Sequence, residues 1–191
     1  AESLIAGHGA FDADDFVARL VAWIPSARGI GRATREAVSA LARGEPWDEV
    51  GVRIGSSGNG AAMRSAPVGL VHALDPSPAP LFSDAVRFSL PTHAGEVGVA
   101  SAVALAAAVA WLARAGASGE TSFSPAELMT FVTAACGPLE SAPSLTRSTP
   151  QRPEWLRERL AAVPAWLDRS PDDVFAETWT GAFALESVPA A

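Results

Sequence analysis

The sequence contains no lysine and no tyrosine, and it has one cysteine, Cys136. All 14 basic residues are therefore arginines. The missing lysine excludes a Walker-type phosphate loop, which needs a Gly-Lys-Ser/Thr sequence to hold the phosphates. A lone cysteine cannot form an internal disulfide, and its apolar helical neighbours predict a buried, unreactive thiol. A free thiol fits a reducing compartment, so a cytoplasmic location is expected.

Positive charge is scarce as well. Acidic residues outnumber basic ones, which gives a net charge of −7 at pH 7. A surface that follows a phosphate backbone requires a basic stripe or basic residues interleaved with aromatic ones. The arginines of this sequence form neither pattern. No nucleic-acid partner is therefore expected. The length of 191 residues suits one domain with a sizeable core.

A long uncharged run occurs at Val97–Ala113. Its 17 residues are just enough to suggest a membrane span. Alanine and glycine dominate the run, however, and no anchoring residues flank it, so a buried core helix is favoured and no membrane partner is expected. Gly98, Ala102, Ala106 and Ala110 recur at i, i+4 spacing. Such a ridge of small side chains lets neighbouring helices pack closely.

The rest of the sequence predicts helices and few strands, because apolar residues recur with the period of amphipathic helices. Ser124 and Ser170 each precede a proline and are expected to cap a helix, and Thr92 is expected to cap the longest one. Helices are expected over 12–23, 32–43, 61–72 (broken near Pro67), 83–88, 94–115, 125–136, 153–163 and 170–179, with helical character at both chain ends, and loops over 51–60, 75–80 and 138–153. The predicted fold class is all-α, a single-domain orthogonal helical bundle around a buried alanine-rich central helix.

The most informative segment is Gly55–Leu70, GSSGNGAAMRSAPVGL. Gly55, Gly58 and Gly60 allow the backbone to take positive φ and a ligand to approach the main chain closely. An apolar helix is expected to begin at about Ala61, and the unpaired N–H groups of its first turn would suit a phosphate or a carboxylate. Two serines and an asparagine add short donors and acceptors. The same pattern also fits an ordinary turn before a helix, and the strand that a dinucleotide-binding loop requires is not visible before it.

Two strings in the sequence resemble the ADP-ribosylglycohydrolase family, whose members remove ADP-ribose from modified proteins. The first is GNGAAMR (58–64), followed by APVGL. The second is FSLPTH, Phe88–His93, which is similar to the family's Ser-x-x-Thr-His segment before its central helix. Ala1–Trp23 resembles the stretch that follows the family's first metal motif, and Gly44–Gly51 resembles the stretch that leads into its glycine loop.

The resemblance covers roughly Ala1 to Val103, with one departure at Ala94, where the family often has proline. It implies a hydrolase that cleaves the glycosidic bond between ADP-ribose and a side chain or related acceptor. The implied partner is an ADP-ribosylated protein or a small ADP-ribose conjugate. Two Mg²⁺ ions would position the ribose hydroxyls and activate the attacking water.

The resemblance also implies which residues bind the substrate. The glycine loop and the histidine would hold the diphosphate and the ribose, although a lone histidine at a helix start is more often structural. The implied substrate-binding residues are Gly55, Ser56, Ser57, Gly58, Asn59, Gly60, Met63 and His93.

The family's metal motifs, Thr-Asp-Asp and Asp-x-Asp-Thr, do not occur in the chain. No metal-binding or catalytic residue is therefore assigned. The acidic pairs Asp14-Asp15 and Asp172-Asp173 are expected in first helical turns, where carboxylates complement the helix dipole. The chain 1–191 is interpreted as a domain of this family that is incomplete at both ends, and it is not expected to be active alone. The alternative is a non-catalytic ADP-ribose-binding or scaffold protein.

Overall fold

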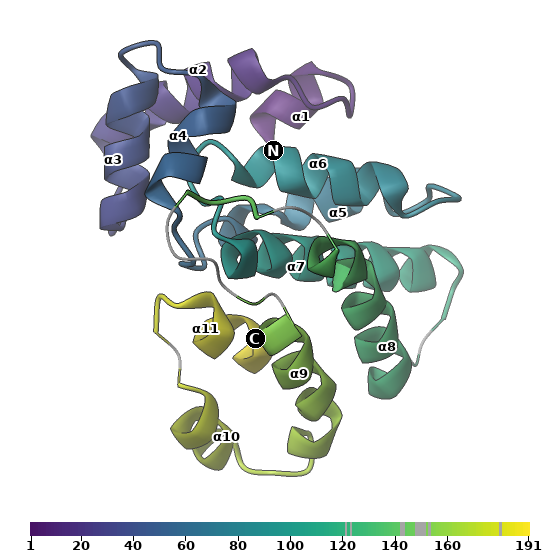
Figure 1. Ribbon diagram of the computed structural model, residues 1–191. Helices are drawn as coiled ribbons and strands as arrows, with labels where there is room; N and C mark the ends of the chain where they lie inside the picture. Colours follow the sequence, from purple (N-terminus) through teal and green to yellow (C-terminus); the bar gives the residue numbers. More distant parts are fainter. Residues whose placement is uncertain (121, 123, 142–143, 148–151, 153, 180) are drawn as a thin grey trace.

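The computed structural model describes residues 1–191 except 121, 123, 142, 143, 148–151, 153 and 180. The described residues form eleven α-helices and four short 3₁₀ turns, and none of them belongs to a strand. The helices pack around one central helix (Figure 1). The predicted all-α class is confirmed.

The central helix is α7 (Glu96–Ala117), and twelve of its residues are buried. By length and composition alone it could cross a membrane, but 67% of its most apolar stretch is buried inside the protein. The expectation of a buried core helix is therefore confirmed. Its ridge of small side chains also packs as predicted, since a Cβ atom on Gly69 would collide with the carbonyl oxygen of Ala106.

Helices from both halves of the chain contact α7. In Figure 1, α6 runs alongside α7, whereas α8 crosses it steeply. These partners of α7 are α5 (Ala66–Val71), α6 (Ala79–Ser89), α8 (Pro125–Cys136) and α11 (Ala184–Ala190). Cys136, at the end of α8, is fully buried, and burial raises the pKa of its thiol to about 12. The predicted unreactive thiol agrees with this environment.

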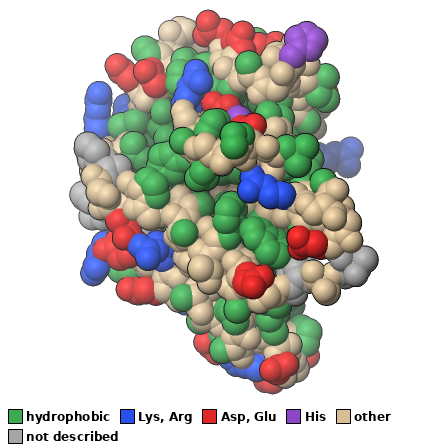
Figure 2. All heavy atoms as spheres, turned by 90° about the vertical axis from the view of Figure 1, so that its right-hand side faces the viewer, with side chains coloured by type: hydrophobic (Ala, Val, Ile, Leu, Met, Phe, Trp, Pro, Cys, Tyr) green, Lys and Arg blue, Asp and Glu red, His purple; other side chains and the backbone are tan. Residues whose placement is uncertain are grey.

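The remaining helices lie above and below this central layer in Figure 1. The upper group contains α1 (Glu2–Ala6), α2 (Ala13–Trp23), α3 (Arg32–Leu41) and α4 (Trp47–Ile54). The lower group contains α9 (Glu154–Ala162) and α10 (Pro171–Thr178), and it returns to α7 through α11. Figure 2 shows the side of the molecule where α7 ends and α8 begins, with hydrophobic side chains gathered among scattered acidic and basic ones.

Two of the predicted caps are confirmed. The Ser124 hydroxyl accepts a hydrogen bond from the Glu127 backbone N–H at 3.3 Å, and the Ser170 hydroxyl accepts one from Asp173 at 3.2 Å. Each bond satisfies one of the donors that the first helical turn leaves unpaired.

The predicted cap at Thr92 is wrong. Helix α7 begins two residues later than expected, at Glu96, with Gly95 as its extended N-cap residue. The hydroxyl of Thr92 is bonded instead to the side chains of Arg64 and His93. A tertiary contact therefore occupies the group that local sequence assigns to a cap.

Some predicted element limits are also wrong. The segment 51–60 is not all loop, because α4 continues through Gly51, whose missing side chain lets it lie against the backbone of Leu90. The expected helix 61–72 is divided into a 3₁₀ turn, Ala62–Arg64, and α5, which begins at Ala66, so the expected break near Pro67 is confirmed. Helix α6 includes residues 79–80 of the expected loop 75–80, since proline is tolerated in a first turn. The expected loop 138–153 begins with a 3₁₀ turn and lies partly outside the described residues.

Candidate functional site

The glycine loop, residues 55–60, joins α4 to the 3₁₀ turn Ala62–Arg64. Gly55 ends α4 in the left-handed conformation, with φ 61° and ψ 37°. Of the three loop glycines, only Gly55 uses the freedom to take a positive φ, and Gly58 and Gly60 do not. Gly60 is needed for close packing instead, whereas a Cβ atom on Gly58 would meet its neighbours at ordinary contact distances of 3.4 and 3.5 Å.

The close packing is against the imidazole of His93. A Cβ atom on Gly60 would lie 2.6 Å from Cε1 and 2.7 Å from Nε2 of His93. Both distances are too short for any side chain at position 60. The histidine is 4% exposed, so the loop covers its ring almost completely. The structure thus brings the predicted loop and the predicted histidine together.

The loop also lies against the start of α7. The backbone N–H of Gly95 donates to the carbonyl of Ser56 at 3.2 Å. A Cβ atom on Gly95 or on Gly98 would lie 2.8 Å from that same oxygen. Two glycines one helical turn apart therefore let the loop touch the helix backbone directly.

A third segment, close to the C-terminus, covers the other side of the loop. The N–H of Asn59 donates to Ala182 at 2.8 Å, and the N–H of Ala184 donates to Ser57 at 3.1 Å. The side-chain amide of Asn59 donates to the hydroxyl of Ser187 at 2.9 Å. Part of the hydrogen-bonding capacity of the loop is thus used within the chain.

The expected helix N-terminus after the loop is not present. The next element is a single 3₁₀ turn, Ala62–Arg64, and the following helix α5 has six residues. The expected helix start at about Ala61 is therefore wrong, whereas anion binding by the loop stays a prediction. Met63 is 74% exposed, and its backbone N–H donates to the carbonyl of Asn59 at 2.9 Å.

Arg64 is the residue that the sequence-based analysis of the site missed. Its Nη2 donates to Oγ1 of Thr92 at 2.5 Å and to the carbonyl of Phe88 at 3.2 Å, and its Nη1 donates to the carbonyl of Gly60 at 3.4 Å. The guanidinium carbon lies 5.7 and 5.6 Å from the ring centres of Phe16 and Phe88. The sequence feature that could have identified this residue is an arginine among the mostly apolar residues of AAMRSAPV.

The charge of Arg64 is unusual because no carboxylate among the described residues pairs with it. Carbonyl oxygens and aromatic faces hold the guanidinium instead, and its Nε lacks a hydrogen-bond partner. Burial lowers the pKa of Arg64 to about 10, which still leaves it charged at neutral pH. Burial first, and this charge second, lower the pKa of His93 to about 3. The site therefore holds a cation beside a neutral imidazole.

The acidic pairs of the sequence do not form a metal site. Asp12 accepts hydrogen bonds from the backbone of Asp14 and Asp15, and Asp15 pairs with Arg19 at 2.8 Å, all at the start of α2. Asp173 accepts a bond from the Ser170 hydroxyl at the start of α10. In the part of the chain that the structure describes, no three His, Cys, Asp or Glu side chains converge to hold a metal. The residues present do not fit a pair of Mg²⁺ ions.

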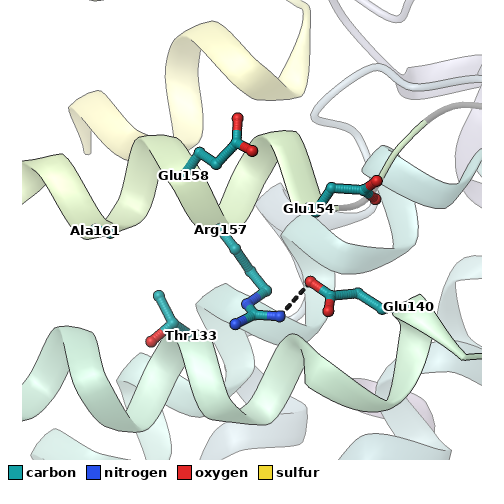
Figure 3. Close-up of a pocket in the computed structure, with 6 residues that line it drawn as sticks. All are labelled: Thr133, Glu140, Glu154, Arg157, Glu158 and Ala161. Atoms are coloured by element: carbon teal, nitrogen blue, oxygen red, sulfur yellow. Dashed lines mark hydrogen bonds and ion pairs between the residues drawn. The ribbon is translucent and has the colours of Figure 1, made fainter.

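A separate hollow of about 380 Å³ lies between α8 and α9 (Figure 3). Arg157 points across it and forms an ion pair with Glu140, while Glu154 and Glu158 extend from the same helix as Arg157. None of its lining residues belongs to the glycine loop or its neighbours. The charge of Arg157 is already paired with Glu140, and the hollow is open to solvent. These features do not select a particular ligand.

Comparisons with known proteins give the following findings. A family model described as ADP-ribosylglycohydrolase matches residues 1–191. The match therefore extends beyond residues 1–103, to which the motif resemblance is limited. A protein from Archaeoglobus fulgidus, described as uncharacterized, is 37% identical over 103 residues. The matched residues are 52% of this chain and 32% of that relative, so the chain covers about a third of the relative's length.

Proposed function

This chain belongs to the ADP-ribosylglycohydrolase family. We propose that it takes part in the removal of ADP-ribose from modified protein side chains or related acceptors. The bond to be hydrolysed is the glycosidic bond that joins the ribose to the acceptor. The proposed partner is an ADP-ribosylated protein or a small ADP-ribose conjugate.

The observation that carries this proposal is the contact between the glycine loop and His93. The missing side chain at Gly60 lets the main chain of the loop lie directly against the imidazole. The unpaired charge of Arg64 lies directly behind this contact, 3.4 Å from the carbonyl of Gly60. A positive potential of this kind favours an anionic ligand, and the diphosphate of ADP-ribose is such a ligand.

The role proposed for this chain is therefore binding. The family is metal-dependent, but the described residues lack a set of metal ligands, and no step of hydrolysis is assigned to them. A non-catalytic ADP-ribose-binding or scaffold role remains the second candidate, and this same lack of metal ligands favours it. Both candidates require that the glycine loop bind ADP-ribose.

Two matched variants of one hydrogen bond test the binding role. Asn59→Ala and Ser187→Ala each remove the bond between the Asn59 amide and the Ser187 hydroxyl. If Asn59 also contacts the ligand, Asn59→Ala weakens ADP-ribose binding by about 1–3 kcal/mol, while Ser187→Ala leaves it nearly unchanged. Isothermal titration calorimetry measures both. Equal affinities in the two variants would place the ligand elsewhere.

A further inference from the structure

Helix α5 has apolar side chains on two opposite sides, and one of these sides packs against the rest of the chain. On the inner side, Val68 is fully buried, and a Cβ atom on Gly69 would collide with the carbonyl oxygen of Ala106 in α7. On the outer side, Leu70 is 60% exposed. A helix that is apolar on all sides is normally buried on all sides. The outer side of α5 is therefore a candidate contact surface.

The exposed apolar surface extends from α5 to α1 and to the turn that follows α5. Ile5 in α1 is 75% exposed, and Leu74 in the turn is 74% exposed. We call these residues together with the outer side of α5 the α1–α5 surface; its members are Ile5, Pro67, Leu70, Val71 and Leu74. Large apolar side chains gathered on one surface of a globular protein are typical of a protein–protein contact.

A hollow of about 380 Å³ lies within this surface, between α1 and α5. Its walls include Leu4 and Ile5 on one side and Leu70 and Val71 on the other. An exposed leucine beside an apolar hollow is suited to an isologous contact, in which each copy supplies both the side chain and the hollow. The α1–α5 surface thus has the shape that a second copy of the same chain can match.

Charge also favours a second copy as the occupant. The net charge of the chain is −7 at pH 7, so two copies repel each other over most of their surfaces. Among the described residues that line the hollow, His8 has the only ionisable side chain, and none is Asp, Glu or Arg. Two copies can therefore meet at this surface without placing carboxylates opposite each other.

We propose that the α1–α5 surface is the contact face of a homodimer. The apolar side chains of each copy, Leu70 and Leu74 among them, are buried against the hollow of the other copy. The contact is isologous and closes at two copies. The glycine loop and His93 do not belong to this surface, so the proposal does not depend on the proposed function.

Sedimentation velocity on the full 191-residue chain tests the oligomeric state directly. Over concentrations of about 1–200 µM at pH 7, we expect the mean mass to rise from 19.6 kDa toward twice that value. A mass that stays at 19.6 kDa over the whole range would overturn the proposal. A mass that grows beyond the dimer would overturn the isologous contact, because that contact cannot continue past two copies.

Two variants and a matched control locate the contact. Leu70→Glu and Ile5→Glu each place a carboxylate on the α1–α5 surface, and each should weaken the dimer at least about tenfold, since a charge buried without a partner is costly. The control is Leu167→Glu, because Leu167 is 57% exposed and follows the 3₁₀ turn Val163–Trp166, outside this surface. The control should associate as the wild type does.

All three substituted side chains are exposed, so the variants are expected to fold, and far-UV circular dichroism checks this. Equal association in the wild type and the three variants would overturn the location of the contact. The wild type gives a further test that needs no substitution. Raising the salt concentration from about 0.05 to 0.5 M should tighten the dimer, because salt screens the repulsion between the copies and the contact has no ion pairs to weaken. Dissociation by salt would show a contact held by charges and would contradict the proposal.

Discussion

A cation without a counter-ion and a histidine kept neutral lie side by side beneath the glycine loop. Arg64 is held by carbonyl oxygens and by the faces of Phe16 and Phe88. Most buried charges in proteins are paired with an opposite charge, so an unpaired one indicates a site whose partner arrives from outside. At the level of single residues, this unpaired charge supports the proposal that the site binds an anion.

The neutrality of His93 has a consequence for stability. Its pKa is lowered to about 3 in the folded chain, from an ordinary value of 6.5. Below pH 6.5 the unfolded chain binds a proton that the folded chain does not bind, so stability falls as the pH falls toward 3. Between pH 7 and pH 5 we expect the free energy of unfolding to decrease by about 2 kcal/mol.

Urea unfolding at both pH values measures this decrease. The variant His93→Gln should lose most of it, while His8→Gln should retain it. The window lies above the range in which the aspartate and glutamate side chains titrate, so their protonation contributes little. The same pH dependence in His93→Gln and in the wild type would contradict the assignment to His93.

At the scale of elements, the sequence predicts what depends on neighbours along the chain. The caps at Ser124 and Ser170 are local contacts over three residues, and both are as expected. Thr92 has the same local signature, but Arg64, 28 positions away, takes its hydroxyl. The sequence suggests that Gly60 allows a positive φ and close approach of a ligand, but its packing against His93, which no local pattern records, is what requires a glycine there.

Close helix packing around α7 gives a prediction at this scale. A Cβ atom on Gly69 would collide with the carbonyl of Ala106 and lie 3.0 Å from Cβ of Val109. Backbone atoms cannot move aside as a flexible side chain can, so Gly69→Ala should lower the free energy of unfolding by about 1–3 kcal/mol.

Gly116→Ala on α7 is the matched control, since nothing lies within 4 Å of its Cβ position. That variant should raise stability by up to about 1 kcal/mol, because alanine favours the helix. Urea unfolding at pH 7 measures both variants. A Gly69→Ala variant as stable as the wild type would mean that α5 and α7 are not packed backbone to backbone.

At the scale of the whole molecule, the site depends on three distant parts of the chain. The glycine loop, the start of α7 and the segment that leads into α11 meet through backbone hydrogen bonds. The family could be recognised from the loop and the Thr-His segment, because these strings are short and specific. The cover supplied by residues 182–187 could not be predicted, since it depends on how the lower helices return to α7.

The 191-residue chain alone lacks the ligands that metal-dependent catalysis requires. Residues 121, 123, 142, 143, 148–151, 153 and 180 include no Asp, Glu, His or Cys, so every such side chain of the sequence is described. No three of these described side chains converge on a metal. Hydrolysis of this bond by a metal-bound water needs several oxygen ligands. We therefore expect the chain to release no ADP-ribose from an ADP-ribosylated protein in millimolar Mg²⁺, while still binding free ADP-ribose.

Two double variants test whether the acidic pairs bind Mg²⁺. One carries Asp14→Asn and Asp15→Asn, and the other carries Asp172→Asn and Asp173→Asn. Asp15 pairs with Arg19, and Asp173 accepts from Ser170, so these carboxylates stabilise helix starts and are not free to hold Mg²⁺. Each double variant should lose a little stability and leave ADP-ribose binding unchanged. Metal-dependent release by the wild type that either double variant abolishes would show that an acidic pair at a helix start does bind the metal.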